Sequence, residues 1–150
     1  TSLRLFNVYG PGQNMENLRQ GMVSIYMAFI LNNRPVLVKG SPDRYRDIVY
    51  IDDVIDAYLA VLENPATFGK SYNVATGRKT SVSELIRAEL KAFGHDPESY
   101  KVTFGASTPG DTFGIYADIS AIRRDTAWVP KVSLPEGLGI MAAWAKGAVK

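Results

Sequence analysis

The chain has 150 residues, a length that fits one compact domain with a continuous hydrophobic core. Hydrophobic residues make up 46% and charged residues 21%, which excludes an intrinsically disordered chain. Seventeen Lys and Arg against fifteen Asp and Glu give a formal charge of +2, scattered along the chain. Nothing in this charge points to nucleic acid or a membrane as a partner.

The rarest residue types exclude several kinds of chemistry. The chain has no cysteine, so it has no disulfide, no thiolate nucleophile and no Cys-based metal site. Its single histidine, His95, excludes a multi-histidine metal site and argues against a Ser-His-Asp triad. The longest apolar run is too short to span a bilayer, and no signal peptide opens the chain, so we expect a cytoplasmic protein. The start at Thr1 also points to a piece trimmed from something longer.

Strand-like and helix-like segments alternate from one end of the chain to the other. Apolar periodicity and turn residues predict, in order, a strand at 3–8, a helix at 16–31, strands at 35–39 and 48–51, a helix at 54–62, a strand at 71–74, a helix at 82–93, a strand at 100–104, and helices at 119–126 and 134–145. This order predicts an α/β fold in which at least part of the sheet is parallel.

Polar residues stand at the predicted helix starts. Asp52 and Asp53 look like a metal-binding pair, but they precede a helix and we interpret them as caps. Ser81 with Glu84 has the spacing of a capping box, in which each side chain satisfies a free backbone N–H of the first turn.

Asn7 opens a glycine-containing turn, NVYGPGQ at residues 7–13. At the carboxyl end of a parallel strand such a turn can approach a ligand, and the Asn7 amide can donate a hydrogen bond to it. A plain reverse turn is the alternative, which the residues alone favour. The turn is not a dinucleotide fingerprint, because Gly10 and Gly12 are followed by Met15 where a third glycine is needed.

Two further charged residues are candidates for ligand binding. The Arg46 guanidinium can bind phosphate oxygens in bidentate geometry, but composition alone favours a local salt bridge with Asp47. Asp111 ends the turn that begins at Thr108, where its carboxylate either accepts hydrogen bonds from a sugar or ribose hydroxyl or caps the turn.

Taken in order, these motifs resemble the carboxyl-terminal part of the extended short-chain dehydrogenase/reductase family, specifically the NAD-dependent nucleotide-sugar epimerases and dehydratases. The matching segments are RLFNVYGP at 4–11, RDIVYIDDV at 46–54, YNVATG at 72–77, PGD at 109–111, ADIS at 117–120 and WVP at 128–130. The resemblance covers essentially the whole chain and implies a substrate-binding domain with the last segments of a Rossmann sheet, lacking the amino-terminal cofactor half. Residues 1–150 would then form a single partial domain.

The resemblance also implies roles for individual residues. Asn7 would hydrogen-bond the diphosphate of a nucleotide sugar, Arg46 would clamp that diphosphate, and Asp111 would hold the nucleotide ribose. This reverses the preference for an Arg46–Asp47 salt bridge. The sequence departs from the family at Thr108, where a second phosphate-binding arginine is common, and the sugar-ring position near Ile115 is not a clean match.

Family catalysis implies NAD, a glycine-rich loop, and a Tyr-x-x-x-Lys pair that exchanges a proton as hydride moves. None of the eight tyrosines in this sequence has a lysine four residues later. We therefore expect these residues alone to bind a nucleotide sugar, to bind no NAD, and to contribute no catalytic residue. The alternative is a free-standing, non-catalytic nucleotide-binding or oligomerising module. In both cases, exposed strand edges predict a homo-oligomer, most simply a dimer.

Overall fold

In the computed structural model, which describes residues 1–16, 21–107 and 109–148, the strands pair two by two. Three of the pairs in these ranges are parallel: β1 (Ser2–Leu5) with β6 (Ser71–Val74), β2 (Asn7–Tyr9) with β5 (Ile48–Tyr50), and β3 (Val36–Lys39) with β8 (Val102–Gly105). The fourth pair, β4 (Tyr45–Arg46) with β7 (Thr80–Ser81), is antiparallel. The predicted α/β class with parallel pairing is confirmed.

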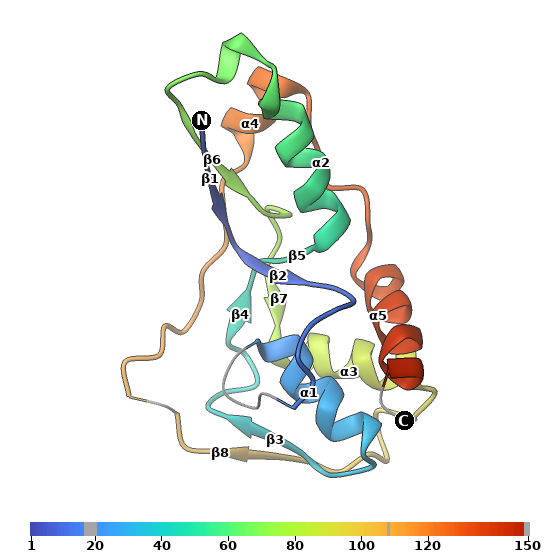
Figure 1. Ribbon diagram of the computed structural model, residues 1–150. Coiled ribbons are helices and arrows are strands. Elements are labelled where there is room, and N and C mark those ends of the chain that lie inside the picture. The colour runs from blue at the N-terminus through green and yellow to red at the C-terminus, as the bar shows by residue number, and fades with distance from the viewer. Residues whose placement is uncertain (17–20, 108, 149–150) are drawn as a thin grey trace.

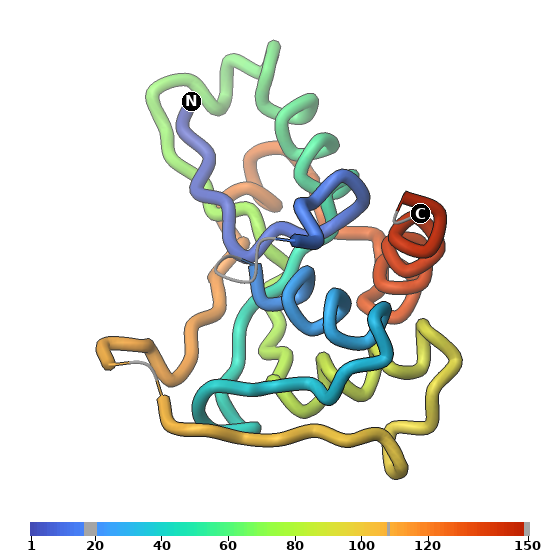
Figure 2. The backbone as a smooth tube through the Cα atoms, turned by 60° about the horizontal axis from the view of Figure 1, so that its bottom comes forward, coloured from blue at the N-terminus to red at the C-terminus, as the bar shows by residue number. Residues whose placement is uncertain are grey.

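The helices gather at the two ends of an elongated molecule (Figure 1). One end holds α1 (Met22–Leu31), α3 (Val82–Phe93) and α5 (Leu134–Ala148), beside β3 and β8. The other end holds α2 (Ile51–Leu62), a short 3-10 turn (Pro65–Thr67) and α4 (Ser120–Thr126), beside β1 and β6. Figure 2 shows β3 and β8 side by side along one edge, although about sixty residues of chain lie between them.

Two hydrophobic clusters fill the two ends, and β5 separates them. Ile48 and Tyr50 belong to the larger cluster, among α1, α3 and α5, whereas Val49 belongs to the second cluster, under α2. Successive side chains of a strand point to opposite faces, so one three-residue strand contributes to both cores. The paired strands β2 and β5 therefore lie between the two cores and contribute side chains to both.

The first predicted strand is in fact two strands with different partners. The Phe6 N–H donates to the Val74 carbonyl of β6 at 3.1 Å, and the next N–H, of Asn7, donates to the Asp47 carbonyl at 3.2 Å. Strand pairing thus changes from β6 to β5 at Phe6. At this point the chain passes from one end of the molecule to the strands between the two cores. The strands predicted at 35–39, 48–51, 71–74 and 100–104 are confirmed within one or two residues at each end.

Two of the predicted helix starts are wrong. Glu16 lies outside any helix, residues 17–20 lie outside the described ranges, and α1 begins at Met22, because Gly21 has a φ of +83° that does not continue a helix.

Tyr50 is the residue before α2, so Asp52 and Asp53 lie in its first turn and do not cap it. The cap at Ser81 is confirmed, since its hydroxyl accepts from the Glu84 N–H at 3.1 Å.

The outer face of α2 is apolar and uncovered. Four side chains at helical spacing, Ile55, Tyr58, Leu59 and Leu62, are between 50% and 69% exposed. Within the described residues, β1 also pairs only with β6, so its second edge has no strand partner. An apolar helix face and an open strand edge thus lie at the same end of the molecule (Figure 1).

Candidate functional site

Two arginines converge on the carboxylate of Asp111. Arg46 lies on β4, and its Nη2 is 2.8 Å from Oδ1 of Asp111. Arg44 precedes that strand and forms an ion pair with Oδ2 of the same carboxylate. The side chains of Arg44 and Arg46 are mostly buried, at 11% and 17% exposed, whereas the Asp111 side chain is 26% exposed. With two guanidinium groups and one carboxylate, the cluster carries a net positive charge.

The backbone explains why these residues meet. Arg44 and Arg46 are two residues apart, so their side chains leave the extended chain on the same side. The loop that carries Asp111 runs beside β4, where the Tyr45 N–H donates to the Phe113 carbonyl at 3.2 Å and the Tyr45 carbonyl accepts from Ile115 at 3.4 Å. Arg46 also donates to the carbonyls of Tyr45 and Phe113, at 2.9 and 3.4 Å. The loop is therefore held against the strand by backbone and side chain together.

The single carboxylate of Asp111 does not neutralise both guanidinium groups. The Nε of Arg44 is buried and has no hydrogen-bond partner in the described part of the chain. Burial, followed by the charge of Arg44, lowers the pKa of Arg46. A buried donor without an acceptor is unfavourable, and so is a pair of neighbouring cations. Both costs would fall if a second anion entered beside Asp111.

Asp47, the residue after Arg46, does not pair with it. Its carboxylate instead holds neighbouring segments of the chain together by hydrogen bonds. Its fully buried carboxylate accepts from the N–H and hydroxyl of Thr76, at 2.7 and 2.6 Å, and from the N–H groups of Gly77 and Ala117, at 2.9 and 3.2 Å. The local Arg46–Asp47 salt bridge that composition favoured is therefore wrong. Asp47 instead joins three separate segments of the chain next to β5.

Asn7 lies beside the cluster but does not touch it. Its side chain is exposed, and its Nδ2 donates to the carbonyl of Asp47 at 3.0 Å. No hydrogen bond between described residues links Asn7 to Arg46 or Asp111. The structure therefore brings Arg46 and Asp111 together. It places Asn7 on β2, where the Asn7 side chain bonds Asp47, the residue that follows Arg46.

Sequence reasoning did not select Arg44, although a signal was present. The Arg-x-Arg spacing places both guanidinium groups on one side of an extended segment, which is how they reach the same carboxylate. Within the described residues, the hydrogen bonds to the Asp111 carboxylate come from arginine side chains. Thr108, where the sequence departs from the family, lies outside the described residues.

An aromatic group borders the cluster. The Tyr45 ring lies edge-on to those of Phe113 and Tyr116, at 6.1 and 6.4 Å between centroids, and the Lys79 ammonium sits 4.9 Å from the Tyr45 ring and 4.7 Å from the Tyr116 ring. Ile115 and Tyr116, the expected sugar-ring region, are about half exposed. Aromatic and apolar surface is thus available next to the two arginines.

The described residues do not form a metal site or a dinucleotide phosphate loop. They contain no group of three or more His, Cys, Asp or Glu placed to hold a metal ion. The turn at Gly10 and Gly12 lacks the third glycine of a dinucleotide phosphate-binding loop. In addition, no helix in the ranges that the structure describes is long and apolar enough to cross a membrane.

Comparison with known proteins assigns the family. The family model described as "NAD dependent epimerase/dehydratase family" matches residues 1–75, which is half of the chain. The chain belongs to this family. Two curated members are similar along most of it: the dTDP-L-rhamnose 4-epimerase of Burkholderia thailandensis is 30% identical over 95% of the chain, and the UDP-glucose 4-epimerase of Mycolicibacterium smegmatis is 35% identical over 88%. The chain spans about two fifths of the length of these epimerases, 38% and 41%.

Solved structures of epimerases share the fold. The Thermotoga maritima UDP-glucose 4-epimerase, solved with UDP-glucose, superposes with a TM-score of 0.90 at 30% identity, covering 99% of this chain and 46% of that one. The Bacillus cereus UDP-glucuronic acid 4-epimerase, solved with UDP-glucuronic acid and NAD, gives 0.86 at 29% identity, covering 97% and 45%. The predicted partial fold of the extended short-chain dehydrogenase/reductase family is therefore confirmed.

Proposed function

We propose that this chain is the nucleotide-sugar-binding part of an NAD-dependent epimerase or dehydratase. The observation that carries the proposal is the convergence of Arg44 and Arg46, with a surplus positive charge, next to Asp111. Arginine forks match the oxygens of a diphosphate, and a carboxylate accepts hydrogen bonds from ribose hydroxyls. Membership of the family supports a nucleotide sugar as the ligand that offers both groups.

Each residue then has a part in binding. Arg46 pairs with the diphosphate, and Arg44, whose Nε has no acceptor among the described residues, supplies the second guanidinium expected at Thr108. Asp111 exchanges its ion pairs for the ribose hydroxyls when the diphosphate takes the two arginines. Asn7 offers the diphosphate the second N–H of its amide, since the first bonds Asp47.

We further propose that these residues contribute no catalytic group by themselves. No tyrosine in the sequence has a lysine four residues later, and the turn after the first strand lacks the third glycine of a dinucleotide-binding loop. In the family, NAD transiently accepts a hydride from the sugar carbon that bears a hydroxyl group, and this chain supplies no residue to that step. Its own residues would hold and orient the substrate. The lack of cysteine fits a reducing, cytoplasmic setting.

Calorimetric titration with UDP and with UDP-glucose tests the binding role. Arg46→Ala should weaken binding by about 2 kcal/mol, because it removes a charged hydrogen-bond donor from a mostly buried site. Lys101→Ala, which removes one exposed positive charge elsewhere, should leave the affinity unchanged. Equal affinities for the wild type and Arg46→Ala would remove Arg46 from the site, and no binding of either ligand would favour a non-nucleotide role.

A second function, self-association, is favoured by the apolar face of α2 beside the open edge of β1. We propose that the 150-residue chain forms a homodimer through Ile55, Tyr58, Leu59 and Leu62, with β1 at the margin of the interface. Light scattering should give twice the chain mass of 16.5 kDa, and Leu59→Glu should return the monomer. A monomeric wild type at high concentration would contradict the dimer without affecting the nucleotide site.

A further inference from the structure

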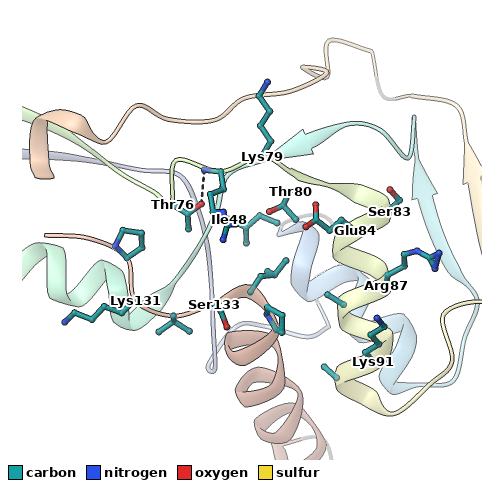
Figure 3. A pocket seen from close by; sticks show the side chains of 17 residues that line it. Ile48, Thr76, Lys79, Thr80, Ser83, Glu84, Arg87, Lys91, Lys131 and Ser133 are labelled. Carbon is teal, nitrogen blue, oxygen red and sulfur yellow. Dashed lines mark hydrogen bonds between the residues drawn. The ribbon is translucent and has the colours of Figure 1, made fainter.

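A cavity separate from the arginine cluster opens between α3 and the start of α5. It has a volume of about 980 Å³ and is lined by those two helices, the loop at 76–80 and the segment at 130–135 (Figure 3). Neither arginine of the cluster, nor Asp111, lines it. Volumes of about 300 to 1,000 Å³ are typical of sites for small organic molecules.

The residues that line this cavity are strongly basic, and we call it the basic cleft. One of them is acidic, Glu84, and five are basic: Arg78, Lys79, Arg87, Lys91 and Lys131. The surplus of positive charge is large for a chain whose total formal charge is +2. A cavity lined mostly by one sign of charge concentrates the opposite sign within it.

Three of the five cations already have partners. Lys131 pairs with Asp56 at 2.7 Å, Arg87 forms an ion pair with Glu98, and the Lys79 ammonium lies over the rings of Tyr45 and Tyr116.

The remaining two, Arg78 and Lys91, are exposed and have no carboxylate within ion-pair distance among the described residues. Lys91 stands one helical turn beyond Arg87 on α3 (Figure 3). Arg78 approaches from the loop that follows β6, so the two free cations come from different walls of the basic cleft.

Apolar and hydroxyl-bearing side chains make up the rest of the lining. Ile48, Ala88, Ala92, Val132 and Leu134 line the cavity together with two prolines. The first turn of α5 begins at this wall, and its N–H groups add a positive partial charge. A ligand that fits must combine several negative charges with a body able to lie on apolar surface.

We propose that the basic cleft binds a phosphorylated small molecule of nucleotide size, at a site distinct from the one proposed for the nucleotide sugar. Its phosphates lie between Arg78 and Lys91, and its organic body contacts the apolar wall formed by α3 and residues 132–134. The proposal does not depend on the role of Arg46, because none of Asn7, Arg44, Arg46 and Asp111 lines the basic cleft.

Calorimetry with ATP as the probe, in low salt, tests the proposal on the full chain. The double variant Arg78→Ala/Lys91→Ala should lose at least tenfold in ATP affinity and keep its UDP affinity. Arg46→Ala should do the reverse. The matched control Arg34→Ala/Lys101→Ala removes one arginine and one lysine from exposed positions outside the cavity, and it should leave ATP affinity unchanged.

Inorganic triphosphate separates the charge from the organic body, and we expect it to bind at least tenfold more weakly than ATP. Equal affinity for ATP in the wild type and in the Arg78→Ala/Lys91→Ala variant, or no ATP binding, would overturn the proposal. A loss of ATP binding in Arg46→Ala would place ATP in the arginine cluster and would also overturn it. None of these results would alter the UDP test of the proposed function.

Discussion

Nη2 of Arg46 lies 2.8 Å from Oδ1 of Asp111, although 65 residues of chain separate them. The contact joins β4 to the loop that follows β8, and Arg44 shares the same carboxylate. In the proposed binding site, the Asp111 carboxylate therefore takes the place that phosphate oxygens would have against the two arginines.

The substitution Asp111→Asn should tighten binding of inorganic pyrophosphate, which has no ribose to lose. The neutral amide no longer competes for the two arginines, so we expect a gain of about 1 kcal/mol, the scale of a partly exposed ion pair. Calorimetry with pyrophosphate measures it. Asp43→Asn changes the net charge equally on an exposed carboxylate without an ion pair to a described residue, and should have no effect. Weaker pyrophosphate binding by Asp111→Asn would contradict this role.

The substitution Asp47→Asn should destabilise the fold by about 3 kcal/mol, because an amide group would face buried donors that now bond a carboxylate. The donors belong to Thr76, Gly77 and Ala117. Urea unfolding followed by circular dichroism gives the free energy of unfolding. Asp52→Asn, on an exposed carboxylate five residues along, serves as the control and should change stability little. Equal stability of both variants would mean that the carboxylate does not hold these segments together.

Glu89 should make the fold less stable as pH rises. Its carboxyl group is fully buried, neither oxygen has a hydrogen-bond partner among the described residues, and burial raises its pKa well above the ordinary value of 4.5. The folded protein therefore retains a proton that the unfolded chain releases above pH 4.5. The contribution of this group is complete below that pH and is lost as pH rises through the folded-state pKa.

The variant Glu89→Met should accordingly gain about 2 kcal/mol of stability at pH 8, because a buried apolar side chain replaces an unpaired polar one. Urea unfolding at pH 4 and pH 8 should show a gain that is larger at pH 8. The exposed Glu63→Gln variant should show no such difference. A gain in Glu89→Met that was the same at both pH values would show that the carboxyl group does not titrate in this way.

Gly137 allows α5 to approach Tyr9, and the substitution Gly137→Ala should destabilise the fold by about 2 kcal/mol. A Cβ at this position would clash with the Tyr9 Oη and lie 2.9 Å from the Tyr50 ring, and both residues belong to the larger core.

At Gly139, on the same helix, an added methyl group would meet no described atom within 4 Å apart from its chain neighbours and the nearby helix backbone. Gly139→Ala should stabilise the helix by about 0.5 kcal/mol. Thermal unfolding of the two variants should therefore shift in opposite directions. A parallel shift would show that the contact with Tyr9 does not limit residue 137.

Local signals were sufficient to predict most of the elements. Ser81 caps α3, and Gly94 ends it in the left-handed conformation, because both effects act within a few residues. Asp53 could not be interpreted in this way. Its carboxylate accepts from the N–H groups of Lys131 and Val132, at 2.8 and 3.1 Å, which lie more than 75 residues along the chain. A cap and a long-range acceptor look identical in the sequence.

The candidate site was predictable residue by residue but not as an arrangement. Arg46 and Asp111 were singled out separately, and their contact depends on the loop at 109–116 lying against Tyr45. The part played by Arg44 depends on its burial, which its position in a loop does not reveal. The roles of Asn7, Arg46 and Asp111 in binding remain predictions that the titrations will test.

The position of β5 between the two cores has a consequence for cooperativity. If β5 slipped by one residue against β2, Ile48 would leave one cluster and Val49 the other at the same moment. The two ends of the molecule should therefore melt in a single transition, despite their separate interiors. Arg46 comes two residues before Ile48, so a ligand held by its guanidinium would raise the melting temperature of the whole chain, including the end that it never touches.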